Sequence, residues 1–448
     1  MEEIKYYETT LAQDVVILQT KYCLDKRVVN ILASMSSSTP LDFEVLKQAF
    51  NLVVERNDCL RLRFVKKDKK LIQYFEKIVK FDNIPTLEFK TEKEFLNFIN
   101  KIKKKPIKYK KGVVIEPFFI KNHDGKYMVL LKVCHLILDL YGINIIFKDL
   151  FDVYIALINQ TNLPETPVQF ETLIEKDLKK KNDESFRNSN IEFYNNYFKN
   201  TERPTYAGIH GDNSKIWLKQ KNKGKIGMKM FLVNCNTKGY CHQVDKNLVN
   251  KINEYCLETK TSPAHFIFYT MNICCSKVNH DVPVILPLGL SNCRGTAQEK
   301  KCAGTKAQSA ACNVKFNFDQ PFENELKAFV KNQMLLYRHL GCSDTDMQML
   351  LYKNYKYSFL ECLYGITFSF VPFAMPEGLK FMIYSNEKCV LPAYIGVLYD
   401  ITKQEMQIAY DVQTKIITES DVISFHKKLC DIMEQVIKNP QILLKDIK

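Results

Sequence analysis

The sequence predicts a mixed α/β fold, of the α/β or α+β class. Helical and extended patterns alternate through both halves of the chain, which is typical of mixed folds rather than of helical bundles. The chain has 448 residues, enough for two domains. Its 46% hydrophobic and 25% charged residues are the balance of a globular protein with substantial cores.

The elements of the first half follow from hydrophobic periodicity. Residues 41–56, LDFEVLKQAFNLVVER, have apolar residues at helical spacing, and residues 59–65, CLRLRFV, alternate like a strand. Residues 115–135, IEPFFIKNHDGKYMVLLKVCH, predict two strands joined by a turn at 123–125. Residues 143–158, INIIFKDLFDVYIALI, predict an amphipathic helix, and residues 175–203 predict a polar helical segment.

The second half repeats this alternation. Its predicted helices cover residues 244–259, 262–278 and 417–438, and the second of them starts at Ser262 or Pro263. Its predicted strands cover residues 282–290, 366–373, 394–401 and 405–411.

His135 and Asp139 stand four residues apart in the otherwise apolar run VCHLILDLYG. Burying either side chain costs free energy unless it is paired or hydrogen-bonded, so the two are either a satisfied core pair or functional residues. They fall on a predicted strand-to-helix connection, where functional side chains are often positioned. Cys134 offers a thiol nucleophile as another possibility, but neighbours on a strand point to opposite faces.

The net charge of +14 comes from 64 basic and 50 acidic residues. Lysine is densest in residues 66–70, 101–111 and 179–181. Such runs are either solvated faces or a surface for an acidic partner. No nucleic-acid motif accompanies them, so we do not expect a nucleic-acid partner.

The cysteines give no sign of disulfides or of a metal site. There are 15 of them, an odd number, without any C-x-x-C pair, which favours free thiols in a reducing compartment and no metal. The opening MEEIKYYETT has no apolar segment typical of a signal peptide. The longest apolar region, residues 128–147, is interrupted by charged and polar residues, so we expect a cytoplasmic protein without a membrane span.

Five segments, in order, resemble the condensation domain of nonribosomal peptide synthetases, in the chloramphenicol acetyltransferase-like superfamily. They are YYETTLAQ, LDFEVLKQAFNLVVERNDCLRLRF, CHLILDLYG, LGLSNCRGTAQEKKCAG and FSFVPF. The resemblance implies two acetyltransferase-like lobes in a V-shaped pseudo-dimer, with the active site in a tunnel at their junction. The first lobe, with the H-x-x-x-D motif, would cover about residues 1–180 and the second about residues 181–448.

The same resemblance assigns roles to the motif residues. His135 would be the catalytic histidine, acting through Nε2 as a general base or as a positioning group. Asp139 would pair with Arg294 across the junction and hold the shape of the loop. Gly142 completes the candidate catalytic set, because the family's glycine would present a backbone N–H to the developing oxyanion.

The sequence departs from the family at two positions. Cys134 replaces the first of two tandem histidines, and Leu140 replaces the glycine after the aspartate, so that Gly142 comes two residues late. Ser369, in FSFVPF, is a further expected neighbour of the site.

The implied activity is that of a free-standing condensation-type acyltransferase. It would form an amide or ester bond between a carrier-protein thioester donor and an amine acceptor in nonribosomal peptide-like biosynthesis. No cofactor would be bound permanently, because an acyl or peptidyl carrier protein would deliver the phosphopantetheine thioester in trans. We expect a monomer that also meets a small-molecule substrate, and a landing surface for the acidic carrier at Lys103, Lys104 and Lys105.

Two alternatives remain open. One is an acyltransferase that uses acyl-CoA or a carrier thioester and a small free amine or alcohol. The other is a catalytically silent homologue that only binds carrier proteins, for which Cys134 and Leu140 are the main support.

Overall fold

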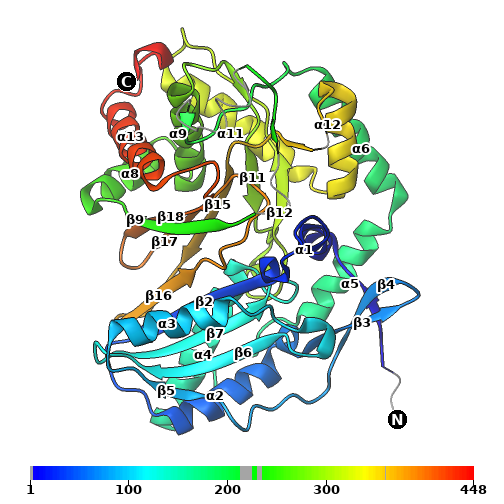
Figure 1. The fold of residues 1–448 in the computed structure, drawn as a ribbon, viewed down its shortest axis with the longest axis vertical. Helices are drawn as coiled ribbons and strands as arrows, with labels where there is room; N and C mark the ends of the chain where they lie inside the picture. Colours follow the sequence, from blue (N-terminus) through cyan, green and yellow to red (C-terminus); the bar gives the residue numbers. More distant parts are fainter. Residues whose placement is uncertain (1–3, 212–223, 230–234, 359) are drawn as a thin grey trace. The chain divides into compact units, whose positions relative to one another are not determined.

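The computed structural model describes residues 4–211, 224–229, 235–358 and 360–448 (Figure 1). It confirms the mixed α/β class. The chain forms two compact units: unit 1 comprises Met1–Asp183, Asn292–Ala307 and Phe373–Lys388, and unit 2 comprises Glu184–Ser291, Gln308–Pro372 and Cys389–Lys448. Two segments of the range 181–448 therefore belong to the unit that also contains Met1–Asp183.

Unit 1 is built on a five-stranded sheet of order β16-β2-β7-β6-β5, in which only β5 and β6 are parallel neighbours. Strands β6 and β7 are the predicted hairpin. The strands are β2 (Asn30–Ser37), β5 (Thr86–Glu88), β6 (Ile115–Lys121), β7 (Tyr127–Cys134) and β16 (Leu379–Tyr384).

Helices cover both faces of this sheet (Figure 1). On one face, α3 (Glu92–Lys103) packs Phe95, Ile99 and Ile102 against the strands. On the other face lie α2 (Phe43–Arg56) and α4 (Leu140–Asn159): Phe43 of α2 stacks on Phe119 of β6, and Phe147 of α4 meets Phe381 of β16 edge to face. The central strand β7 is consequently buried from its second residue to its end.

The rest of unit 1 contains a second, smaller sheet and several helices and 3₁₀ turns. A three-stranded sheet has the order β1-β4-β3, and α1 (Leu11–Tyr22) follows β1 directly. The predicted strand at residues 59–65 is wrong in its first half, which is the last part of a 3₁₀ turn, Asp58–Arg61. The remaining elements are β1 (Tyr7–Glu8), β3 (Leu62–Lys67), β4 (Lys70–Phe75), α5 (Phe170–Lys181), α10 (Ala297–Lys300) and the 3₁₀ turns Lys26–Val29 and Tyr109–Lys111.

Unit 2 is built on a six-stranded sheet of order β12-β11-β15-β17-β18-β9. Its helices bury their apolar faces in one large hydrophobic core. The strands are β9 (Thr237–Gln243), β11 (Leu288–Ser291), β12 (Gln308–Ala311), β15 (Thr367–Phe373), β17 (Ala393–Asp400) and β18 (Glu405–Gln413), with the short pairs β8 (Met228–Lys229) with β14 (Glu361–Cys362) and β10 (Val284–Ile285) with β13 (Val314–Lys315). The helices are α6 (Glu184–Lys199), α8 (Lys246–Glu258), α9 (Pro263–Val278), α11 (Phe322–Arg338), α12 (Asp344–Tyr355) and α13 (Glu419–Lys438).

Two predicted elements of this region are each split in the structure. The strand expected at residues 282–290 is two strands, β10 and β11, separated at Pro287, whose missing N–H cannot join a ladder. The polar helical segment expected at residues 175–203 is two helices, because α5 ends at Lys181 and α6 starts at Glu184, in the other unit.

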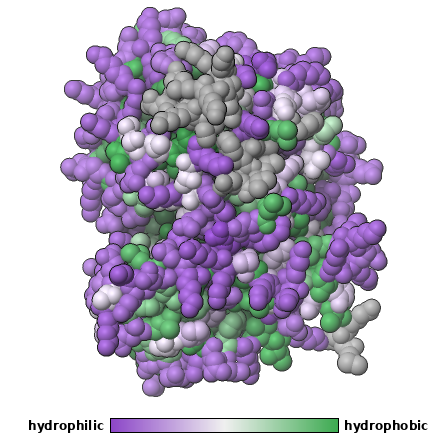
Figure 2. Space-filling model, in the orientation of Figure 1, coloured by the Kyte–Doolittle hydropathy of each residue, from purple (hydrophilic) through white to green (hydrophobic). Residues whose placement is uncertain are grey.

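The face of the molecule shown in Figure 2 is mostly hydrophilic, with hydrophobic residues in small groups. Among the helices of the described ranges, none is long and apolar enough to span a lipid bilayer.

Candidate active site

His135 is the first residue after β7, in the connection 135–139 that leads into α4. Its backbone N–H donates to the Val29 carbonyl at 2.8 Å, and its carbonyl accepts from the Thr305 hydroxyl. The next three residues, Leu136 to Leu138, are completely buried. Hydrogen bonds with Val29 and Thr305, both in unit 1, thus hold the backbone of this connection. His135 is therefore carried on a fixed backbone.

The His135 side chain is partly exposed, with one ring nitrogen inside. Within the described residues, Nδ1 is buried and has no hydrogen-bond partner. Burial lowers the pKa of the His135 imidazole below its ordinary value, and the backbone of His135 itself, the Asp139 carboxylate and the Leu138 backbone oppose this shift only in part. The lowered pKa keeps the ring mainly neutral at pH 7, and because Nδ1 is buried, Nε2 is the candidate nitrogen for contact with a substrate.

Asp139 is the N-cap of α4 and is only 4% exposed. Its carboxylate accepts a bidentate pair from Arg294, with Nη1 to Oδ2 at 3.0 Å and Nη2 to Oδ1 at 3.2 Å. Three backbone N–H groups complete its shell: Gly142 at 2.7 Å, Lys306 at 2.9 Å and Ala307 at 3.1 Å. Burial alone would raise the pKa of Asp139, but the Arg294 guanidinium and these hydrogen bonds lower it below its usual range.

Asp139 and Arg294 are the two residues that the sequence analysis expected to pair across the junction of the lobes. In the structure both belong to unit 1, since the segment 292–307 is part of that unit. Arg294 is 3% exposed, and the Tyr141 ring covers it with its centroid 4.7 Å from Cζ. The pair therefore fixes one loop of unit 1 to the start of α4 and contributes no proton acceptor.

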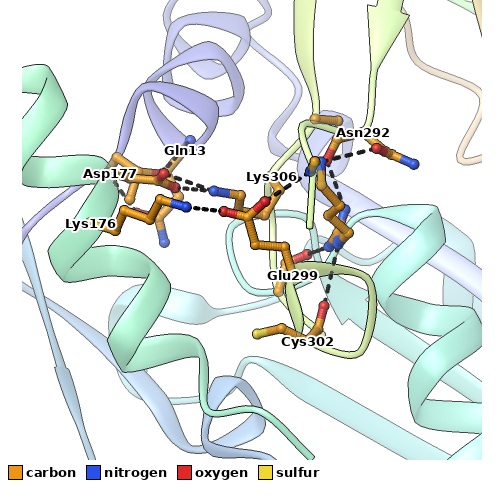
Figure 3. Close-up of polar contacts among 12 residues, drawn as sticks. Gln13, Lys176, Asp177, Asn292, Glu299, Cys302 and Lys306 are labelled. Carbon is orange, nitrogen blue, oxygen red and sulfur yellow. Dashed lines mark hydrogen bonds and ion pairs between the residues drawn. The ribbon is translucent and has the colours of Figure 1, made fainter. Parts of the chain in front are cut away.

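The segment 292–307 is also tied to α5 by two ion pairs (Figure 3). The Nζ of Lys306 contacts both carboxylate oxygens of Asp177 at 2.7 Å. Lys176 pairs with Glu299, whose carboxylate also accepts from the N–H groups of Gly295 and Thr296. These contacts hold the segment against α5.

Gly142 and Gly304 make a close backbone contact. A Cβ at Gly142 would lie 2.9 Å from the N and O atoms of Gly304, so the approach needs a glycine. Gly304 itself has φ +131° and faces Phe170. Because the Gly142 N–H is already donated to Asp139, this group does not serve an oxyanion, and the role expected for Gly142 gives way to a packing role.

A family model confirms what the motif and its neighbours suggest. The sequence model of the condensation domain family matches residues 3–336 of this chain. The chain belongs to the condensation domain family. No curated protein sequence matches it.

Solved condensation domains have the same fold. A variant of the starter condensation domain of rhizomide synthetase RzmA in complex with C8-CoA has a TM-score of 0.81 at 15% identity, covering 99% of this chain and 98% of that one. The first condensation domain of the calcium-dependent antibiotic synthetase gives 0.81 at 12%, with 99% of each chain. The condensation domain of the Monacolin K polyketide synthase MokA gives 0.81 at 12%, with 99% of this chain and 100% of that one.

Cys134 and Leu140, at which this condensation domain departs from the family pattern, and the expected site neighbour Ser369 lie in different environments. Cys134 is fully buried, and burial raises the pKa of its thiol to about 12, so it stays protonated and is a poor nucleophile at neutral pH. Leu140 is the first residue of α4. Ser369 lies on β15 in unit 2, where its hydroxyl shares a 2.7 Å hydrogen bond with Tyr394, and its place near the site stays a prediction.

The three lysines expected to receive a carrier protein are not equivalent. Lys103 is only 14% exposed at its side chain and forms an ion pair with Glu387 at 2.6 Å. Lys104 and Lys105 are exposed, at the C-terminal end of α3 and just after it. Lys103 is therefore mostly buried and already paired, whereas Lys104 and Lys105 are exposed to solvent.

Some site residues of this condensation domain were given no role from sequence. Thr305 donates to the His135 carbonyl, the Lys306 N–H donates to Asp139, and the Tyr141 ring covers Arg294. Gln13, inside the segment YYETTLAQ, donates to the Leu136 carbonyl. Gln13, Thr305 and Lys306 are far in sequence from the 135–139 connection, so only the fold reveals their contacts with it. Across the described part of the chain, no cluster of three His, Cys, Asp or Glu side chains is placed to bind a metal.

Proposed function

We propose that this condensation domain transfers an acyl group from a thioester donor to an amine, forming an amide bond. The observation that supports this most directly is the neutral His135, partly exposed at the end of β7 on a backbone fixed by Val29 and Thr305. We further propose that the donor is a phosphopantetheine thioester on an acyl or peptidyl carrier protein. The thioester supplies the driving force, so the reaction needs no metal or nucleotide.

In the proposed reaction the acceptor nitrogen attacks the thioester carbonyl while Nε2 of His135 takes its proton. The C–S bond then breaks, and the same proton passes to the departing sulfur. Asp139 takes no part in these transfers, because its lone pairs are used by Arg294 and backbone N–H groups. Gly142 is occupied in the same way, so the oxyanion needs another donor.

Acyl-CoA is a second candidate donor, because one similar domain, that of RzmA, was solved in complex with C8-CoA. A catalytically silent carrier-binding protein is the third reading, favoured by Cys134 in place of the first histidine and by the engaged Gly142 N–H.

Intact mass spectrometry of an acyl-loaded carrier protein separates these three functions. The protein is incubated with the loaded carrier or with acyl-CoA, together with free or carrier-bound amines. Loss of acyl from the donor carrier, with a matching amide on the free or carrier-bound acceptor, supports the proposal, whereas product from acyl-CoA alone supports the second candidate. Carrier binding without any acyl loss contradicts both enzymatic functions.

The lowered pKa of His135 sets the expected pH dependence. A base must be neutral to accept a proton, so kcat/KM should be level around pH 7 and fall as the pH drops through the imidazole pKa. Because burial lowers this pKa, the midpoint of the acid limb should lie below pH 6.5, the ordinary value for histidine. Rates measured in buffers of constant ionic strength test this, and a midpoint above 6.5 would contradict it.

Lys104 and Lys105 are the proposed landing surface for the acidic carrier. The Lys105 carbonyl accepts from the side chain of Asn30 at 2.8 Å, and Asn30 lies opposite Cys134 in the β2–β7 ladder. The basic loop is therefore anchored beside the strand end that leads to His135. Long-range attraction to such a surface can speed encounter by ~10–10³-fold.

Reversing these two charges, Lys104→Glu with Lys105→Glu, should raise the KM for a carrier-bound thioester and leave that for a small thioester mimic unchanged. Added salt should do the same to the wild type, since exposed charges are screened over ~8 Å at physiological ionic strength. Lys246→Glu with Lys251→Glu, exposed on α8, is the matched control for net charge. Equal effects of both double variants would mean that the lysines only keep the protein soluble.

A further inference from the structure

Gln13 lies on α1 (Figure 3) and its side chain is completely buried. Its Nε2 donates to the carbonyl of Leu136 at 3.0 Å. Leu136 directly follows His135, so a side chain from the N-terminal helix holds the connection that carries the candidate base.

The hydrogen-bonding capacity of the Gln13 amide is filled. Its Oε1 accepts from the Thr10 N–H at 2.9 Å and from Nε2 of Gln73 at 2.8 Å. Its Nε2 donates to Oε1 of Gln73 at 2.7 Å and to Leu136. A primary amide has two donors and one oxygen with two lone pairs, so this pattern fixes the amide in one orientation.

Gln73 is in turn fixed by β1. It is fully buried on β4, and its Nε2 also donates to the Glu8 carbonyl at 2.7 Å. The reciprocal pair of Gln13 and Gln73 thus links the three-stranded sheet to the His135 connection. Thr305 donates to the His135 carbonyl and Gln13 donates to the next carbonyl, that of Leu136. Two successive carbonyls are thus each held by a side chain from a different part of unit 1.

The attachment of α1 does not by itself require this amide. Lys181 of α5 donates to the Thr9 carbonyl and to Asp14, both at 2.6 Å, and so anchors the start of α1 without touching the 135–139 connection. A buried apolar residue would fill the volume of Gln13 but would leave the Leu136 carbonyl without a partner.

We infer that Gln13 is a positioning residue for the proposed acyl transfer. Its amide, oriented by Gln73, fixes the Leu136 carbonyl and thereby the place of the His135 ring relative to the reacting thioester. This inference rests on the proposed function. A displacement of about 1 Å in such a connection can cost ~10²-fold in rate without loss of substrate binding.

The test compares three variants of the whole chain. Gln13→Met keeps the length of the side chain and removes all its hydrogen bonds, and kcat should fall about 10–100-fold with KM little changed. Gln73→Met leaves the bond to Leu136 but frees the amide to turn, so its loss of kcat should be smaller. Lys181→Met should lower the melting temperature and leave kcat unchanged.

An NMR titration of His135 in the same variants gives a readout that does not depend on activity. Because burial lowers the pKa of this imidazole, a displaced connection should raise it in Gln13→Met and not in Lys181→Met. If the wild type turns over no donor, the proposed function fails while the titration still tests the positioning. A Gln13→Met variant with the wild-type pKa, and a kcat no lower than that of Lys181→Met, would overturn the inference. If Gln13→Met does not fold, an unchanged pKa and kcat in Gln73→Met would overturn it instead.

Discussion

Replacement of His135 by alanine is expected to lower turnover by ~10²–10⁴-fold, the usual contribution of a general base. The backbone of His135 would keep its bonds to Val29 and Thr305, since neither involves the imidazole. The Nδ1 atom has no partner in the described structure whose loss would destabilise the protein. The variant should therefore melt close to the wild-type temperature and still bind its donor.

Acyl transfer by purified His135→Ala, measured together with its thermal unfolding, checks this expectation. His135→Gln is a useful companion, because it restores polar volume without a base and should be equally slow. A folded His135→Ala variant that keeps more than about a tenth of the wild-type rate would exclude the role of base, since such assistance is ~10²-fold or larger.

The second large effect is expected on stability. Asp139→Ala should lower the free energy of unfolding by ~3–5 kcal/mol, the typical cost of removing one member of a buried ion pair. The Arg294 guanidinium would remain buried without its carboxylate, and three backbone N–H groups would lose their acceptor. The start of α4 and the loop 292–307 should come apart together.

A double-mutant cycle with Arg294→Met measures the coupling of this pair. The double variant should be less unstable than the sum of the two single variants, because it leaves no unpaired charge. Asp139→Asn keeps an oxygen for the N-cap and should lie between wild type and Asp139→Ala. If Asp139→Ala melted like the wild type yet were inactive, Asp139 would act in the chemistry instead.

The elements predicted from sequence are those whose apolar pattern is local. The hairpin β6–β7 and helices α2, α4 and α9 show their period within a single window, and α9 starts at Pro263, one of the two expected positions, with Ser262 as its N-cap. Strand β2 was missed because all its residues are buried, so NILASMSS shows no alternation. Strand β16 pairs with β2 from more than 300 positions along the chain, and local periodicity carries no information on such a pairing.

The residues of the candidate site also fall into two groups, those that the local sequence reveals and those that it does not. His135 and Asp139 stand out locally, as polar residues in an apolar run. Arg294 entered only through family resemblance, and the contact of Gln13 with Leu136 depends on how α1 packs. The pairing of Lys103 with Glu387 also reduced the predicted lysine surface, because a charge run reveals nothing about distant acidic partners.

The discontinuous make-up of unit 1 has a consequence for synthesis. When residue 183 leaves the ribosome, the connection bearing His135 exists, but Arg294 and β16 have not yet been made. The Asp139 carboxylate is then without its cation, and β2 has an open edge that can pair with another chain. Unit 1 can be completed only after about residue 388 has been synthesised. The incomplete sheet must therefore be kept from aggregating while most of unit 2 is translated.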